Sequence, residues 1–376
     1  MRLFFYPPFK PLEHERPSGD LVIASSLVRY LTGQGHEVQP VSRLRARWIY
    51  WRPWLWPQVA RERRRLARLA GRQRPDLWLT YHTYYKAPDL LGPHVSCRAG
   101  MPYVIFQASY ATRRRRALKT WPGFILNRRA LLAADHIFTN RRDDTDNLAR
   151  LVPAERLTYV TPGIRPSEFR FDAEARERLR RAWGVGEEPV VATAAMFRPG
   201  VKALGLAWVI RACGRLFREG TPLCLAVAGD GSEGAKLKRL AGQELAGRVR
   251  FVGRLAREEM HGFYSAGDVF AFPGFEESLG MVFLEAESCG LPVAACADGG
   301  VAEVVSQGLT GVLVSKTDFE AFVQALGRLL AEPGRRRAMG RAAVGYVRTH
   351  HDLDGNYRVL ERKLQEIAGG RAGKKT

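Results

Sequence analysis

The sequence predicts an α/β protein built from two parallel-sheet domains of the Rossmann type. Short apolar runs alternate with helical patterns along the whole chain, which is typical of parallel sheets. The alternation stops at the charged stretch "DAEARERLRRAWGVGEEP" and then begins again. At 376 residues the chain also exceeds the size of one ordinary hydrophobic core, so two domains are expected.

The first domain is expected over residues 1–168. The run "RLFFY" predicts a strand, and "GDLVIASSLVRYLTGQG" predicts a helix that ends at Gly33 or Gly35 before a strand near residues 38–41. Three further apolar runs, "DLWLTYH", "PYVIFQAS" and "HIFTN", predict strands, and "LTYVTPGIRPSEF" closes this half.

The second domain is expected over residues 189–350, after a helical linker at 169–188. Its predicted strands are "PVVATAAMF", "LCLAVAGDG", "RVRFVG", "VFAFPG", "PVAACA" and "GVLV". A last helix at 351–368 is expected to cross back to the first domain, and residues 369–376 are expected to be disordered. Because ligands in such folds bind at the carboxyl ends of strands, the cleft between the two domains is the expected site.

Cysteine usage and the start of the chain bear on location. The five cysteines have no metal-ligand spacing and are expected to be buried thiols in a reducing compartment. No apolar run approaches the roughly 18 residues of a spanning helix, and "MRLFFYPPFKP" does not resemble a signal peptide. The sequence therefore predicts a cytoplasmic protein, attached at most to the cytosolic face of the inner membrane.

The net charge of +21 is concentrated in the first half of the chain. Residues 1–165 hold 29 Lys and Arg against 12 Asp and Glu, a net charge of +17, and residues 166–376 hold 30 against 26, a net charge of +4. Such asymmetry concerns partners rather than fold, and the first half is expected to contact nucleic acid, anionic lipid or a phosphorylated substrate.

The stretch "FEESLGMVFLEAESCGLPV" places two glutamates around the start of a predicted helix. If Ser278 caps that helix, the amides of Gly280 and Met281 are free to bind an anion. Glu277 and Glu285 would flank the anion and accept hydrogen bonds from sugar hydroxyls. The alternative, two surface glutamates, explains neither the glycine nor the position after the strand "VFAFPG".

Two further loops of the second half suit a nucleotide. Arg198 and Lys202 lie in a Pro/Gly loop after its first strand, where two cations suit a diphosphate, although a solvated loop is an equal alternative. Gly229 opens "GDGSEG", which has the spacing of a dinucleotide fingerprint but no acidic residue after the next strand. A tight turn, in which Gly229 lets a nucleotide approach the backbone, is the preferred interpretation.

With these motifs the second half resembles the nucleotide-sugar-binding domain of retaining glycosyltransferases of family 4, which have the GT-B fold. The resemblance runs through "VATAAMFRPGVKALGLAWVIRA", "VAGDGSEGAKLKRLA" and the segment from "RVRFVG" to "GVAEVV". It implies that Glu277 contacts the donor sugar, Glu285 the ribose, and Arg198 and Lys202 the diphosphate. One residue fewer than usual separates this Arg from this Lys.

The first half resembles the acceptor domain of the family more loosely. In "PSGD", where the family has two glycines near the donor phosphates, only Gly19 matches. Gln107 stands where many members have a histidine. Asp20, His82 and Gln107 are the acceptor-side candidates, and a structural role is the alternative for His82.

Neither a metal ion nor a cofactor is expected. "RDDTD" contains the D-x-D pattern of metal-dependent glycosyltransferases of another fold, but here it is typical of the acidic first turn of a helix. Members of the resembling family stabilise the leaving diphosphate with cations and helix dipoles instead.

Arginines and tryptophans gather at residues 48–74 and 113–121 of the first half. This composition favours peripheral contact with an anionic membrane. The main alternative is a solvated basic helix with its tryptophans in the core. Binding to nucleic acid is not favoured, because it would leave the site in the second half unexplained.

The resemblance implies hexosyl transfer from a nucleoside-diphosphate sugar, with retention, to an anionic or lipid-linked glycan such as a lipopolysaccharide core. Two alternatives stay open at this point. One is a sugar-nucleotide epimerase of the same fold, and the other is a non-catalytic protein that binds an anionic polymer.

Overall fold

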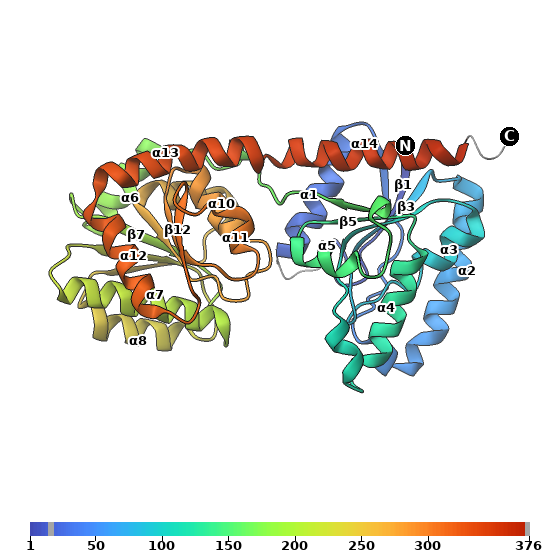
Figure 1. The fold of residues 1–376 in the computed structure, drawn as a ribbon, viewed down its shortest axis with the longest axis horizontal. Helices are drawn as coiled ribbons and strands as arrows, with labels where there is room; N and C mark the ends of the chain where they lie inside the picture. The colour runs from blue at the N-terminus through green and yellow to red at the C-terminus, as the bar shows by residue number, and fades with distance from the viewer. Residues whose placement is uncertain (14–18, 373–376) are drawn as a thin grey trace. The chain divides into compact units, whose positions relative to one another are not determined.

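The computed structural model describes residues 1–13 and 19–372, and the chain divides into two compact units (Figure 1). Unit 1 contains residues 1–161 and the chain from residue 354 onward, and unit 2 contains residues 162–353. In the described residues each unit is built on a six-stranded parallel sheet. This is the GT-B architecture of two Rossmann-like domains that the sequence predicts.

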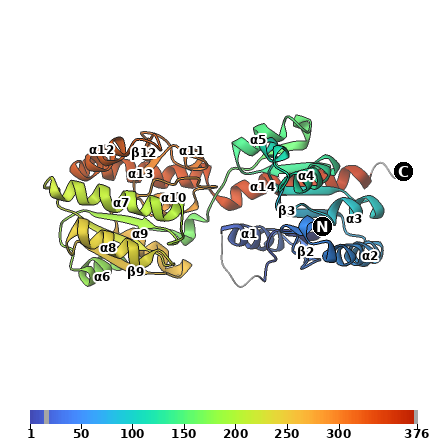
Figure 2. The same ribbon diagram turned by 90° about the horizontal axis from the view of Figure 1, so that it is seen from below.

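Unit 1 has the strand order β2-β1-β3-β4-β5-β6. Helices α2, α3 and α4 lie on one face of this sheet and α1 lies on the other (Figures 1 and 2), as right-handed crossovers require. The elements are β1 (Arg2–Tyr6), α1 (Gly19–Gly33), β2 (Glu37–Pro40), α2 (Trp56–Gln73), β3 (Leu77–Thr83), α3 (Gly92–Ala99), β4 (Tyr103–Ala108), α4 (Trp121–Ala133), β5 (His136–Thr139), α5 (Arg142–Leu148), β6 (Leu157–Tyr159) and α14 (Leu353–Ala372).

Unit 2 has the strand order β12-β11-β10-β7-β8-β9. Its elements are α6 (Ala173–Trp183), β7 (Val190–Ala194), α7 (Val201–Arg218), β8 (Cys224–Ala228), α8 (Gly234–Leu245), β9 (Val249–Gly253), α9 (Met260–Ala266), β10 (Val269–Ala271), α10 (Met281–Ser288), β11 (Val293–Cys296), α11 (Val301–Val304), β12 (Gly311–Val314), α12 (Phe319–Ala331) and α13 (Pro333–His350).

Each sheet has one point where the strand order reverses. In unit 1 this point lies between β1 and β3, and in unit 2 it lies between β7 and β10. The loops that leave the carboxyl ends of these strands diverge to opposite faces of the sheet and leave a crevice, which is where open α/β sheets bind ligands.

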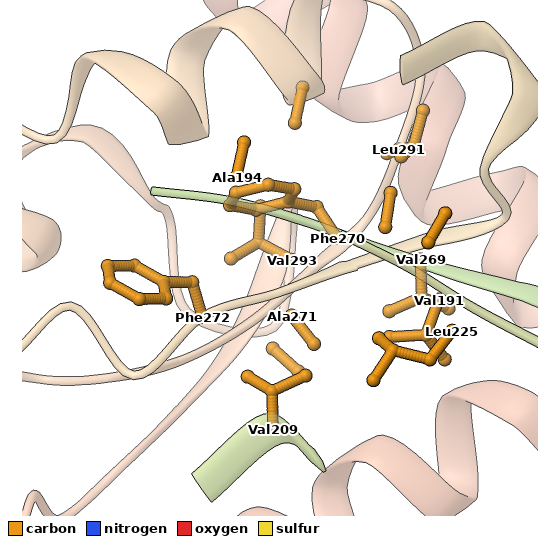
Figure 3. Packing of buried hydrophobic residues seen from close by; sticks show 14 of the residues in the cluster. Val191, Ala194, Val209, Leu225, Val269, Phe270, Ala271, Phe272, Leu291 and Val293 are labelled. Atoms are coloured by element: carbon orange, nitrogen blue, oxygen red, sulfur yellow. The ribbon is translucent and has the colours of Figure 1, made fainter. Parts of the chain in front are cut away.

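The four central strands of unit 2, β7, β8, β10 and β11, are buried on both faces of the sheet, and the edge strands β9 and β12 are half-buried. Val269, Phe270 and Ala271 of β10 are fully buried among side chains of the neighbouring strands, among them Val191 and Val293 (Figure 3). Helices cover both faces of a parallel sheet, so its strands are continuous apolar runs rather than alternating ones. This is why the strand predictions for unit 2 are close to the observed bounds.

The segment 169–188 is part of unit 2 rather than a free linker. It forms α6, in which Arg176 and Arg180 each form an ion pair with Asp268, at 2.7 and 2.9 Å. Trp183 at the end of α6 packs against the ring of Phe263. The charged composition that suggests a linker therefore reflects ion pairs on the surface of unit 2.

The C-terminal helix packs on unit 1 through a buried polar contact. Glu361 of α14 accepts a hydrogen bond from the Tyr30 hydroxyl of α1 and lies 2.9 Å from His36 Nε2. The helix continues through residues 369–372, which the sequence assigns to a disordered tail. Glycine weakens a helix but keeps its backbone donor, so the glycines at 369 and 370 do not end it. Residues 373–376 lie outside the described part.

Four of the cysteines are buried, as expected, but Cys97 of α3 is exposed. Its helix buries Val95 and Ser96 and turns the next residue toward solvent. The expectation of a buried thiol is wrong at this position, because an eight-residue helix with a single buried face exposes whatever residue follows that face.

Glu287 of α10 is a fully buried carboxyl group, and the Thr310 hydroxyl lies near it and acts to lower its pKa, although neither Glu287 oxygen has a hydrogen bond of good geometry with a described residue. Burial raises its pKa from 4.5 to about 8. The folded chain therefore holds a proton that the unfolded chain releases above pH 4.5, so stability should fall as the pH rises toward 8 and level off above it.

Replacing Glu287 with Gln is expected to raise the melting temperature at pH 8–9. The gain should be about 1–2 kcal/mol rather than the full linkage, because the amide is still buried without partners. Thermal unfolding of the parent and the variant from pH 5 to pH 9 checks this result. An unchanged fall of stability with pH in the variant would mean that another group is responsible.

Candidate functional site

The crevice of unit 2 brings together two of the residues predicted from the sequence. Lys202 lies in the first turn of α7, which follows β7, and Glu277 lies in the loop that follows β10. The Lys202 ammonium forms an ion pair with the Glu277 carboxylate and lies 5.3 Å from the centre of the Phe272 ring. Because β7 and β10 are neighbours at the reversal of strand order, residues 75 positions apart meet at one point.

The amino-terminal end of α10 opens beside this ion pair. Gly280 is its N-cap, with a φ of 64°, and a side chain there would meet Val304 at 2.6 Å. The backbone amides of Gly280 and Met281 donate to no residue that the structure describes. Two free amides at the positive end of a helix form an anion site.

The expected cap by Ser278 is wrong. The Ser278 side chain makes no capping hydrogen bond, since the helix begins at Met281, three residues later. The loop turns earlier, where the Glu277 amide donates to Gly274 O at 3.0 Å. The left-handed conformation at Gly280 replaces the serine cap, and it leaves the helix amides unoccupied instead of using one of them.

A second loop holds the Glu277 loop in place. The Gly300 amide donates to Glu277 O at 2.8 Å, and a side chain at Gly299 or Gly300 would lie within 2.3 Å of the backbone of Glu277 or Ser278. Only glycine allows two backbones to approach this closely. The double glycine after "ACAD" was the sequence signal for this contact, but spacing alone did not connect it to Glu277.

Glu285 makes a separate set of contacts in the same unit. It is 7% exposed, its Oε1 lies 3.2 Å from Arg257 Nη1, and its Oε2 accepts a hydrogen bond from Tyr264 at 3.1 Å. Burial raises its pKa, and the charge of Arg257 and the Tyr264 hydroxyl offset part of this shift. Arg257 and Tyr264 position the carboxylate, and the sequence did not identify either of them.

The remaining predicted residues of unit 2 differ in exposure. Arg198 is exposed and forms no ion pair with any residue that the structure describes. Gly229 has a φ of 137°, and a side chain there would lie 1.9 Å from Ala195 O. Its conformation is thus required for the packing of the loop after β8 against the loop after β7, which is the tight-turn interpretation.

The crevice of unit 1 brings together Asp20 and His82. Asp20 follows β1 at the start of α1, His82 lies near the end of β3, and His82 Nδ1 is 2.9 Å from Asp20 Oδ1. Burial acts to raise the pKa of Asp20, but the hydrogen bond and charge of His82 and the charge of Lys10 outweigh it and lower that pKa. Gly19 begins α1, and residues 17 and 18 of its motif lie outside the described residues.

Two neighbouring residues of this crevice have a left-handed backbone. His82 has a φ of 57° and Gln107 of β4 has a φ of 65°, and β3 and β4 are paired so that these residues lie side by side. Gln107 is 8% exposed, and its Oε1 has no partner among the described residues. A left-handed backbone at two non-glycine residues and an unpaired buried acceptor are both common at binding sites.

We call Asp20, His82 and Gln107, together with Asn140 and Asp144, the polar cluster of unit 1. The sequence did not select the last two. Asn140, directly after β5, is 5% exposed and its Oδ1 is unpaired in the part of the chain that is described. Burial raises the pKa of Asp144, and Arg141, Ser109 and His82 offset part of that shift. Asp144 lies in the acidic first turn of α5, as predicted from "RDDTD". The described residues contain no cluster with the composition of a metal site.

Four of the five tryptophans at residues 48–74 and 113–121 are exposed, and Trp48 is half-buried, whereas Trp78 of β3 lies in the core. We define the basic-aromatic patch as the exposed residues Trp51, Arg52, Trp54, Trp56, Arg113, Arg115, Arg116, Leu118, Lys119 and Trp121. Trp51 Nε1 donates to Lys119 O at 3.0 Å, which joins the two segments of the patch. Exposed fractions of 69% for Trp54 and 52% for Trp121 contradict the alternative that the tryptophans of these segments lie in the core.

Aromatic side chains connect the polar cluster to the patch. The His82 ring stacks on Tyr84 at 4.9 Å, and Tyr84 contacts Tyr85 at 5.6 Å. Tyr85 in turn contacts Trp48, and the ammonium of Lys119, a residue of the patch, lies 5.9 Å from the centre of the Trp48 ring. The Arg114 guanidinium lies over Tyr85 at 4.7 Å. No described helix has the length and the apolar composition needed to cross a bilayer.

Comparison with known proteins shows what the second unit is similar to. The family model described as "Glycosyl transferases group 1" matches residues 188–332. The chain is 36% identical over 228 residues to a GDP-mannose-dependent alpha-(1-6)-phosphatidylinositol monomannoside mannosyltransferase of Mycolicibacterium smegmatis. That match covers 58% of this chain and 58% of the relative, so it spans little more than half of each protein.

Solved structures resemble the fold over almost the whole chain. A sucrose-phosphate synthase from Thermosynechococcus elongatus has a TM-score of 0.75 at 20% identity, over 98% of this chain and 100% of that one. The Anabaena protein HepE in complex with UDP also has a TM-score of 0.75, at 18% identity, over 97% and 100%. At these identities the likeness concerns the fold.

Proposed function

We propose that the chain, whose residues 188–332 match the glycosyl transferases of group 1 and whose fold is GT-B, is a retaining hexosyltransferase. The donor is a nucleoside-diphosphate sugar, and the acceptor is a hydroxyl group of an anionic or lipid-linked glycan. The observation that carries the proposal is the convergence of Lys202, Glu277 and the free amides of α10 at the strand reversal of unit 2.

The donor site follows from the chemistry of these groups. The amides of Gly280 and Met281, with Lys202 and Arg198, bind the diphosphate through charge-assisted hydrogen bonds. Glu277, whose partner Lys202 then turns to the phosphates, accepts hydrogen bonds from the sugar. Glu285, held by Arg257 and Tyr264, accepts hydrogen bonds from the ribose, because a carboxylate oxygen has room for a second donor.

The reaction exchanges one bond at the anomeric carbon for another. The acceptor hydroxyl attacks on the face that the diphosphate leaves, the anomeric carbon–oxygen bond to phosphate breaks, and the hydroxyl proton passes to the departing phosphate oxygen. The cations and the helix amides stabilise the negative charge that develops on the diphosphate. No metal ion takes part in this proposal.

The acceptor side is assigned to the polar cluster of unit 1. The unpaired oxygens of Gln107 and Asn140 offer acceptors for sugar hydroxyls, and Asp20 with His82 offers an acid–base pair beside them. The relative from Mycolicibacterium smegmatis is named for a phosphatidylinositol monomannoside substrate, an anionic glycolipid. This supports a lipid-linked acceptor and gives no support to the epimerase or the non-catalytic alternative.

The basic-aromatic patch supports peripheral contact with an anionic membrane. Its tryptophan rings suit the headgroup level, and its cations suit anionic lipid. Because His82, Tyr84 and Tyr85 connect the polar cluster to the patch, a glycan on a lipid at the surface would be presented close to that cluster. A lipopolysaccharide core is one acceptor with this chemistry.

Slow release of nucleoside diphosphate tests the donor assignment. Incubation of the full chain with a panel of UDP- and GDP-sugars in EDTA is expected to release the nucleoside diphosphate of at least one donor, because water can replace the acceptor. Release should be slow, since water is a poor substitute for the acceptor. The same donor should raise the melting temperature. If release required added Mn²⁺ or Mg²⁺, the stabilisation by cations and helix amides would be wrong. If no donor bound, the proposed activity would be wrong.

A further inference from the structure

Unit 1 contains a cavity of about 520 Å³ that the donor and acceptor sites do not use. It lies between helices α2, α3 and α4, which are neighbours on one face of the sheet (Figures 1 and 2). Its wall combines basic side chains with apolar ones. The lining includes Arg63, His94, Arg98, Arg129, Leu90 and Leu126.

The charge of the cavity is positive. Arg98 and Arg129 are exposed and form no ion pair with any residue that the structure describes. Asp89, the one acidic residue in the lining, is fully buried. Its Oδ1 accepts hydrogen bonds from the amides of Leu91 and Gly92, and its Oδ2 accepts hydrogen bonds from the hydroxyls of Thr80 and Tyr103. The carboxylate is thus hydrogen-bonded inside the fold, where its charge acts on Arg63. Arg98 and Arg129 have no acidic partner among the described residues.

The basic groups face a common space. Arg63 is half-buried, its Nε donates to Leu90 O at 2.7 Å, and its remaining guanidinium nitrogens are free to bind an anion. His94, Arg63 and Arg98 all line the cavity. Partial burial and the charges of the two arginines lower the pKa of His94. Planar guanidinium groups around one space suit a phosphate, which they bind through paired hydrogen bonds.

Two helices connect the cavity to the basic-aromatic patch. Helix α2 begins at Trp56 and helix α4 at Trp121, and both tryptophans belong to the patch. At about 1.5 Å per residue, Arg63 lies about 10 Å along α2 and Arg129 about 12 Å along α4 from these tryptophans. The headgroup layer beyond the hydrocarbon is about 5–8 Å thick, which is less than these distances, so tryptophans at its inner boundary bring the cavity to its outer edge when the two helices lean about 45–60° from the membrane normal.

We propose that this cavity binds the phosphate of an anionic phospholipid headgroup when the patch contacts a membrane. The proposal rests on the membrane contact proposed above and adds a specific site to it. Arg98 and Arg129 hold the phosphate from two sides, Arg63 closes the site from α2, and the apolar wall formed by Leu90 and Leu126 covers the glycerol. A headgroup in this site fixes how unit 1 is turned on the surface, which a diffuse basic surface alone does not do.

Cys97 provides a reporter at the site, because it lines the cavity and the other four cysteines are buried. The rate of its alkylation by iodoacetamide is measured with vesicles of phosphatidylcholine, with vesicles that also contain phosphatidylglycerol, and with soluble glycerol phosphate. At 90% occupancy of the site, vesicles with phosphatidylglycerol should slow alkylation about tenfold, and neutral vesicles should not slow it.

Two double variants separate a specific site from general electrostatic attraction. Arg98→Gln with Arg129→Gln removes two cations from the cavity. Arg61→Gln with Arg128→Gln removes two exposed cations from α2 and α4 that do not line it. The first pair should lose the protection of Cys97, and the second pair should keep it. Co-sedimentation with the same vesicles is measured in parallel for each protein.

The outcomes distinguish the two proposals. Vesicle binding without protection of Cys97, or equal protection in both double variants, would overturn the phosphate site and leave the membrane contact standing. Protection by glycerol phosphate alone, without binding to vesicles, would show a site for a soluble phosphate and overturn the lipid assignment. Binding to phosphatidylglycerol vesicles with protection that only the Arg98 and Arg129 pair abolishes would establish the site.

Discussion

Replacing Glu277 with Ala is expected to lower kcat/KM about 10- to 100-fold while the protein stays folded. A hydrogen bond to a charged group contributes about 1.5–3 kcal/mol, and in the proposed mechanism this carboxylate makes such a bond to the donor sugar. The side chain is 18% exposed and its ion-pair partner is Lys202, so its removal leaves the core of unit 2 intact.

The neighbouring Glu276 supplies a matched control. It is exposed, lies in the same loop and has a left-handed backbone like several residues around it. Glu276→Ala should retain the activity of the parent, and the melting temperatures of both variants should lie close to that of the parent. Equal activity of Glu277→Ala and Glu276→Ala would contradict the site assignment.

Glu285 requires a milder substitution. It is nearly buried, and its loss would leave the Tyr264 hydroxyl unpaired and reduce the partners of Arg257 to Glu168. Glu285→Ala would therefore lose stability as well as activity, since buried groups without partners cost about 1–3 kcal/mol each. Glu285→Gln keeps the size of the side chain and removes its charge, and a rise in the KM for the donor at an unchanged melting temperature is the expected result.

The strands and their order of appearance could be predicted because parallel sheets leave a local signal. Runs such as "LCLAVA" and "PVAAC" are apolar throughout, since helices cover them on both sides. The domain boundary was less accessible. The charges of α6 read as a linker because the partner of Arg176 and Arg180, Asp268, lies about 90 positions later in the chain.

The donor candidates could be chosen from the sequence because each lies at a loop after a strand. The contacts between them could not be predicted. The ion pair between Lys202 and Glu277 depends on β7 and β10 being neighbours, which the order of the strands in the sequence does not reveal. The expected cap at Ser278 is wrong although serine is a common N-cap. The N-cap is Gly280, which has a left-handed backbone and where a side chain would lie 2.6 Å from Val304.

The acceptor side shows a different limit. His82 and Gln107 have a positive φ, which non-glycine residues rarely adopt, and no sequence pattern marks it. The sequence does not select Asn140 or Asp144, because the "RDDTD" pattern is typical of a metal site or of the first turn of a helix. Its position directly after β5, beside the ends of β3 and β4, was the available signal.

Replacing the four arginines at 113–116 with Gln is expected to lower affinity for anionic vesicles about a thousandfold. Each basic residue near an anionic surface contributes about 1 kcal/mol, so four contribute about 4 kcal/mol, and 1.4 kcal/mol corresponds to tenfold. Arg113, Arg115 and Arg116 are exposed, and Arg114 stacks on Tyr85, so their charge lies at the patch itself. Binding of the parent should also weaken as salt is added.

A control with the same loss of charge uses unit 2. Arg335, Arg337, Arg341 and Arg348 are exposed on α13, and their replacement with Gln should leave vesicle binding nearly unchanged, because α13 carries no cluster of exposed tryptophans. A third variant, Trp54→Ala with Trp121→Ala, should weaken the binding that persists at high salt, because these rings supply its apolar part. Co-sedimentation with neutral and with anionic vesicles measures the binding of the parent and of the three variants. Two outcomes would contradict membrane contact by the patch. One is equal partitioning of the parent onto both kinds of vesicle, and the other is an equal loss of binding in the two four-arginine variants. Either would mean that the patch is an ordinary solvated basic surface.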